Sequence, residues 1–117
     1  VKKNNLTFLQ LQNKSGKYVS PDDLTFAAAA AGADWFSVPG MGVSIVDQRG
    51  DTVWPVSTAS FIIMYKDPAD KKASQDAIKF FDWAFRNGKK AAEELDYVAL
   101  PDSLTKQIRE RVWSQIK

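Results

Sequence analysis

Residues 54–88 read WPVSTASFIIMYKDPADKKASQDAIKFFDWAFRNG, and this stretch decides the fold. Its first half contains a nearly continuous apolar run at residues 61–65, rich in β-branched and aromatic side chains. Such a run predicts a strand that is covered on both faces, and we place this strand at residues 53–66. Because Pro55 cannot donate to a ladder, the regular part of the strand is expected to begin after it.

The second half of the stretch predicts an amphipathic helix from residue 69 or 70 to residue 86, after the break at Asp67 and Pro68. Its apolar residues recur at helical spacing and form one face: Ala77, Ile78, Phe81, Ala84 and Phe85. Asn87 and Gly88 end the helix. The spacing within residues 80–85 favours core packing for the aromatic side chains over a stacking platform for a ligand.

Shorter elements are predicted on both sides. Residues 7–12 alternate polar and apolar side chains, which indicates a half-buried strand, and residues 13–16 are typical of a turn. Ser20 and Pro21 predict the start of an alanine-rich helix with a left-handed stop at Gly32. Three further elements are a short strand at residues 43–46, a helix at residues 89–95 and a last helix from about residue 100 with apolar residues at every fourth position.

The composition excludes several classes of function. Sixteen Lys and Arg balance 14 Asp and Glu to give a net charge of +2, which indicates neither nucleic acid nor an anionic membrane as a partner. The chain has no Cys and no His, so the commonest nucleophile, general base and metal ligands are missing. We therefore expect no catalysis, no metal and no cofactor. No run of about 18 apolar residues predicts a membrane-spanning helix.

One hydroxyl-rich segment opens the predicted strand, with Ser57, Thr58 and Ser60 as weak candidates for contact with a ligand. Hydroxyl groups at a strand entry more often bond to the nearby backbone, and we favour that interpretation. The best predicted helix starts all contain Asp, which satisfies the free amides and repels an anion. The sequence therefore predicts no anion cradle and no ligand-binding residue beyond the three candidates.

Four segments carry a likeness to a known family: residues 17–21 (KYVSP), 32–35 (GADW), 54–88 and 95–103 (LDYVALPDS). In order and spacing, they resemble the late part of the phosphate-binding proteins of ABC-type phosphate uptake systems. The likeness fails only at residues 36–50, whose role stays open. Those proteins are two-lobed periplasmic receptors of the class II solute-binding fold. The resemblance implies an α/β fold, a periplasmic location, phosphate as ligand and a membrane permease as partner.

The resemblance also implies an organisation in two parts. Residues 1–53 would complete the second lobe, with residues 1–5 finishing a helix that starts upstream of Val1. Residues 54–117 would hold a crossing strand and the C-terminal helices that return to the first lobe. A hinge is then expected between the parts, where a few residues absorb the rotation as the lobes close. Its residues are Asp51, Thr52, Val53, Trp54, Pro55 and Val56.

The phosphate-gripping motifs of the family have no counterpart in this chain. The resemblance therefore implies that phosphate is bound through an upstream part and that this chain supplies scaffold and hinge. The alternative is an autonomous structural or interaction module that reuses the same half-fold without transport. Self-association is expected for a fragment, because its apolar helices need a sheet to cover them.

Overall fold

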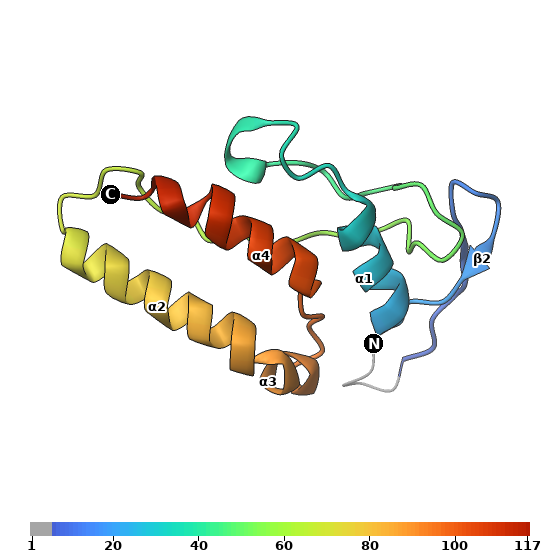
Figure 1. Cartoon of the computed structure of the whole chain (residues 1–117). Coiled ribbons are helices and arrows are strands. Elements are labelled where there is room, and N and C mark those ends of the chain that lie inside the picture. Colours follow the sequence, from blue (N-terminus) through green and yellow to red (C-terminus); the bar gives the residue numbers. More distant parts are fainter. Residues whose placement is uncertain (1–5) are drawn as a thin grey trace. The chain divides into compact units, whose positions relative to one another are not determined.

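A computed structural model describes residues 6–117, which form two compact units: unit 1, described from residue 6 to Ser60, and unit 2 (Phe61–Lys117). The helix end that was expected at residues 1–5 lies outside the described residues. The described residues mix helices with one short β-ladder, which is compatible with a partial α/β fold. Each unit is described separately below, with the elements labelled as in Figure 1.

Unit 1 begins with a hairpin of two short strands, β1 (Leu11–Gln12) and β2 (Tyr18–Val19), paired antiparallel. The predicted turn between them is confirmed: Gly16 has a φ of +77°, and its N–H donates to the Asn13 carbonyl at 2.9 Å. The predicted strand at residues 7–12 is too long, since its regular ladder comprises only the last two of these residues.

The helix of unit 1 is α1 (Asp23–Gly32), and it starts later than predicted. Asp22, not Ser20, is the N-cap residue, and it forms a reciprocal capping box with Thr25. The predicted left-handed stop is also wrong, because Gly32 is the last helical residue and Ala33 follows in an extended conformation. The two buried alanines of the helix are Ala29 and Ala30.

After α1 the chain is mostly irregular. A 3-10 turn, η2 (Pro39–Met41), confirms the predicted break, and Gly40 in it has a φ of +74°. Residues 43–46 and 53–66 contain no strand, which corrects both predictions. A strand needs a neighbouring strand to bond its N–H and C=O groups in a ladder, and among the described residues only β1 and β2 form such a ladder. Ile63 is 95% exposed instead of covered.

Unit 2 consists of helices whose bounds agree closely with the predictions. They are α2 (Lys71–Asn87), α3 (Lys89–Glu94) and α4 (Asp102–Arg111), followed by a 3-10 turn, η3 (Trp113–Gln115). Asp70 caps α2 by accepting from the Ala73 N–H at 2.9 Å. Figure 1 shows α4 beside α2, and the Phe85 and Trp113 rings stack across this contact with centroids 5.5 Å apart.

The aromatic residues of α2 divide into two groups. Phe81 and Phe85 are half-buried, as core packing predicts, whereas Phe80 and Trp83 are exposed and stack on each other with centroids 6.4 Å apart. Core packing is therefore wrong for Phe80. Among residues 6–117, no helix is long and apolar enough to cross a membrane.

Candidate functional site

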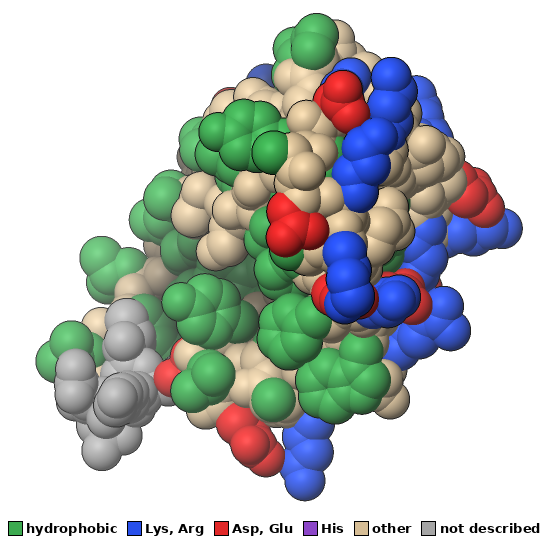
Figure 2. Space-filling view, turned by 90° about the vertical axis from the view of Figure 1, so that its left-hand side faces the viewer, with side chains coloured by type: hydrophobic (Ala, Val, Ile, Leu, Met, Phe, Trp, Pro, Cys, Tyr) green, Lys and Arg blue, Asp and Glu red, His purple; other side chains and the backbone are tan. Residues whose placement is uncertain are grey.

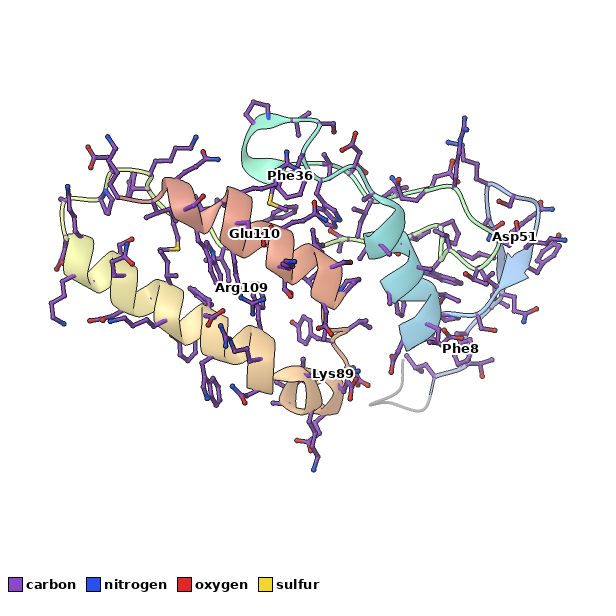
Figure 3. All side chains as sticks on the ribbon, viewed as in Figure 1. Phe8, Phe36, Asp51, Lys89, Arg109 and Glu110 are labelled. Carbon is purple, nitrogen blue, oxygen red and sulfur yellow. The ribbon has the colours of Figure 1, made fainter. Side chains whose placement is uncertain are left out.

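The candidate site is the segment of unit 1 that contains the predicted hinge residues. This segment is held by Asn13 of the β1–β2 turn, a residue that is 5% exposed. The Asn13 Nδ2 group donates to three backbone carbonyls, those of Gly50 at 3.1 Å, Asp51 at 2.9 Å and Val53 at 3.2 Å. Figure 3 labels Asp51 at this end of unit 1. One side chain thus ties the hairpin to a segment nearly 40 residues later.

The same side chain also organises its own turn. Asn13 Oδ1 accepts from the backbone N–H groups of Ser15 and Lys17, each at 3.1 Å. The sequence predicted the turn from its Asn and Gly residues but gave no signal for the long-range bonds. A turn signal is local, whereas the partners of Nδ2 are set by tertiary packing.

Further bonds fix the segment on both sides of Asn13. The Trp54 N–H donates to the Thr25 carbonyl of α1 at 3.1 Å, and the Asp47 N–H donates to the Pro55 carbonyl at 2.9 Å. Val53 and Trp54 are both buried, and the Trp54 ring meets Phe26 edge-on with centroids 6.1 Å apart. Residues 50–55 are therefore held to the hairpin and to α1.

The three hydroxyl candidates lie directly after this segment. Ser57 is buried, and its Oγ donates to the Trp54 carbonyl at 3.1 Å, which is the local backbone bond favoured from the sequence. Thr58 and Ser60 are exposed. The structure brings no charged side chain of the described residues into a hydrogen bond with any of the three.

Carboxylates occupy the starts of the two capped helices. Asp22 and Asp70 each accept from a backbone N–H of the first turn, at 2.9 Å in both cases. These bonds satisfy donors that an anion would need, and the negative charge repels a phosphate. Among residues 6–117, no cluster of three or more acidic residues is arranged to hold a metal ion.

In unit 2 the charged side chains pair with one another. Asp82 of α2 accepts from Arg109 Nε of α4 at 2.5 Å and lies 2.9 Å from Arg86 Nε. Figure 3 shows Arg109 between the two helices. The hydrogen bond from Arg109 is the main cause that holds the pKa of Asp82 below its ordinary value. Lys72 and Lys79 lower the pKa of Asp76 in the same way.

No family model matches the chain. It is 45% identical over 116 residues to the phosphate-binding protein PstS of Pasteurella multocida, a match that covers 99% of this chain and 34% of that protein. It is 38% identical to the phosphate-binding protein PstS of Haemophilus influenzae over 116 residues, covering 99% and 35%. The chain thus spans about a third of the length of these curated relatives.

A more distant match is a putative serine/threonine-protein kinase/receptor of Acanthamoeba polyphaga mimivirus. It is 26% identical over 107 residues, which are 87% of this chain but only 6% of that protein. The name of the viral protein therefore describes mainly residues that this chain does not match.

The first two relatives define the class: they are binding proteins, and the expectation that the chain is not an enzyme is confirmed. Within that class, the chain is related to the phosphate-binding proteins of phosphate transport along nearly its whole length. This similarity confirms the resemblance predicted from the ordered segments of the sequence. The matched length also includes residues 36–50, where no likeness was expected.

Proposed function

We propose that this chain is the C-terminal part of the periplasmic receptor of an ABC-type phosphate importer. The whole receptor binds phosphate between two lobes and delivers it to a membrane permease. This chain contributes scaffold and hinge, whereas the main phosphate ligands come from the rest of the receptor. The similarity to two phosphate-binding proteins over 99% of the chain is the observation that carries the proposal.

The division of the chain belongs to the same proposal. Residues 1–53 complete the second lobe of a class II solute-binding fold, and residues 54–117 supply the crossing strand and the C-terminal helices of the first lobe. The hinge expected from the family resemblance comprises residues 51–56. The exposed apolar side chains at residues 61–65 support this assignment, because a strand that pairs with a sheet elsewhere in the receptor would cover them.

The assignment of the ligands to the rest of the receptor rests on the chemistry of phosphate binding. A phosphate site replaces the hydration shell with backbone N–H groups at helix starts, hydroxyl groups and an arginine. In the described residues, Asp22 and Asp70 occupy two helix starts, and Arg109 is paired with Asp82. Two helix starts and one arginine of the chain are therefore already engaged by carboxylates.

A hybrid receptor tests the proposal. The matched third of the Pasteurella multocida relative is replaced by this chain, and phosphate binding is measured by calorimetry. We expect the hybrid to bind phosphate with one-to-one stoichiometry. The chain alone is expected to give no heat of binding at about 1 mM phosphate, a concentration that would reveal a binding free energy of about −4 kcal/mol or stronger. Stoichiometric binding by the chain alone contradicts the assignment of ligands.

A folding control separates the two parts of this test. Ala77 is a half-buried residue in the middle of α2, and a proline there removes a helical bond at a cost of about 3 kcal/mol. The hybrid with Ala77→Pro is expected to lose phosphate binding together with its cooperative unfolding. A correctly folded original hybrid that fails to bind phosphate contradicts the scaffold role.

The alternative is an autonomous structural or interaction module. The viral match favours this alternative, because the matched segment there is only 6% of a long protein that is not named as a phosphate-binding protein. A module of this kind folds and remains monomeric without the rest of a receptor. The oligomeric state of the isolated chain therefore distinguishes the two proposals.

A further inference from the structure

We propose that the side chain of Asn13 is a clip that keeps residues 47–57 rigid, so that bending between the lobes falls after residue 57. The part of this inference that concerns the two lobes rests on the proposed function. The clip itself is formed by residues of unit 1 alone. Asn13 is a positioning residue, because it acts by fixing the backbone of other residues.

The hydrogen bonds of Asn13 use the full capacity of its amide. The NH₂ group has two hydrogens for the three carbonyls of Gly50, Asp51 and Val53, so at least one hydrogen is shared. The oxygen accepts two backbone bonds, from Ser15 and Lys17, and so uses both of its lone pairs. A buried amide that is satisfied in this way fixes one geometry, because breaking any bond leaves a buried polar group unpaired.

The backbone beyond the clip is held by independent bonds. Trp54 donates to α1, Pro55 accepts from Asp47, and Ser57 caps the segment by donating to the Trp54 carbonyl. Gly50 makes the sharp turn at the start of the segment, with a φ of +137°. Rotation of the backbone within residues 50–57 therefore breaks several buried bonds at once.

The next residues lack these restraints. Within residues 6–117, no backbone N–H of Thr58, Ala59 or Ser60 donates to another backbone group. Thr58 and Ser60 are also exposed, and the boundary between the two compact units falls directly after Ser60. A hinge absorbs its rotation where the backbone can turn without loss of bonds. Residues 51–56, which were predicted as the hinge, thus belong to the rigid segment that precedes it.

Amide hydrogen exchange of the chain, followed by NMR, tests the clip. In the wild type we expect slow exchange at Val53 and Trp54 and fast exchange at residues 58–60. Asn13→Asp keeps an oxygen for Ser15 and Lys17 but replaces the donor with a carboxylate facing three carbonyls. We expect exchange at Val53 and Trp54 to become at least roughly tenfold faster, because buried bonds are lost.

Gln12→Ala is the matched control, since the Gln12 side chain is also an amide in the hairpin but donates only to Gly16, at 3.2 Å. It should leave exchange at Val53 and Trp54 unchanged, and the amides of α2 report on folding of unit 2 in every variant. A folded Asn13→Asp variant with wild-type exchange at Val53 and Trp54 overturns the clip.

The wild-type profile keeps the proposal testable even if Asn13→Asp does not fold. Equally fast exchange at Val53, Trp54 and residues 58–60 in the wild type overturns the clip without any variant. The test uses no phosphate, so its outcome is separate from that of the hybrid receptor. A hybrid that fails to bind phosphate contradicts the receptor assignment but not the clip. Unchanged exchange in Asn13→Asp contradicts the clip but not the receptor assignment.

Discussion

Gly50 shows how a single backbone angle shapes the fixed segment of unit 1. Its φ of +137° lies in a region that only glycine adopts readily, and an added Cβ would lie 2.9 Å from Val53 Cγ2. Val53 is buried and has little room to move. We expect Gly50→Ala to lower the free energy of unfolding of unit 1 by about 1–3 kcal/mol, measured by urea unfolding with tryptophan fluorescence.

Gly42 provides the control for this substitution. Its φ is −74°, and an added Cβ would meet no heavy atom within 4 Å. Gly42→Ala is expected to raise the free energy of unfolding, by less than about 1 kcal/mol, because alanine restricts the unfolded chain more than glycine does. Equal destabilisation by both substitutions would show that the left-handed angle of Gly50 is not the cause.

At the level of elements, Asp82 connects α2 to α4 through Arg109. Its pKa is lowered, so the folded state binds protons less readily than the unfolded state, and the pair stabilises the fold above the ordinary pKa of aspartate, about 3.9. Stability is lost as the pH falls through the lowered pKa. Asp82→Asn should lower the melting temperature at pH 7, and the difference from wild type should shrink below about pH 4.

Asp76→Asn is the matched control, because the pKa of Asp76 is also lowered but its partners, Lys72 and Lys79, belong to the same helix and are exposed. Exposed pairs within one helix contribute little to stability. A smaller loss is therefore expected from Asp76→Asn at pH 7. Equal losses for the two variants would mean that the bond between α2 and α4 adds nothing.

The elements that the sequence predicted well depend on local signals. The cap at Asp70, the apolar spacing of α2 and the Gly88 end all lie within the helix or next to it, so the predicted bounds differ from the observed ones by one or two residues. The start of α1 was missed by two residues because Ser20 and Asp22 are both good caps, and the side chain of Thr25 decides between them.

The features that the sequence did not predict depend on partners far along the chain. The apolar pattern of residues 53–66 is typical of a buried strand, but the pattern gives no information on whether neighbouring strands are present. The bonds from Asn13 to residues 50–53 likewise join segments that no local rule connects. The candidate hinge was therefore located by resemblance alone, and its anchoring became visible only in three dimensions.

At the level of the whole molecule, the chain exposes many large apolar side chains. Figure 2 shows hydrophobic side chains gathered on the face that it draws. The exposed large apolar residues of unit 2 include Phe61, Ile62, Ile63, Tyr65, Phe80, Trp83, Leu95 and Tyr97. Large apolar patches on a protein mark interaction surfaces, and these side chains are the candidates for such a surface in unit 2.

The proposed receptor predicts how the isolated chain behaves in solution. Because the strand neighbours of residues 61–65 are expected in the rest of the receptor, the chain should self-associate with rising concentration, giving a light-scattering mass above 13.1 kDa. Ile63→Lys places a charge at the most exposed of these residues and should reduce the association. Leu24→Lys, an exposed residue of α1, should leave it unchanged. A monomer at every concentration, with cooperative unfolding, would favour the autonomous module, because a surface that needs no cover in isolation needs none from a receptor.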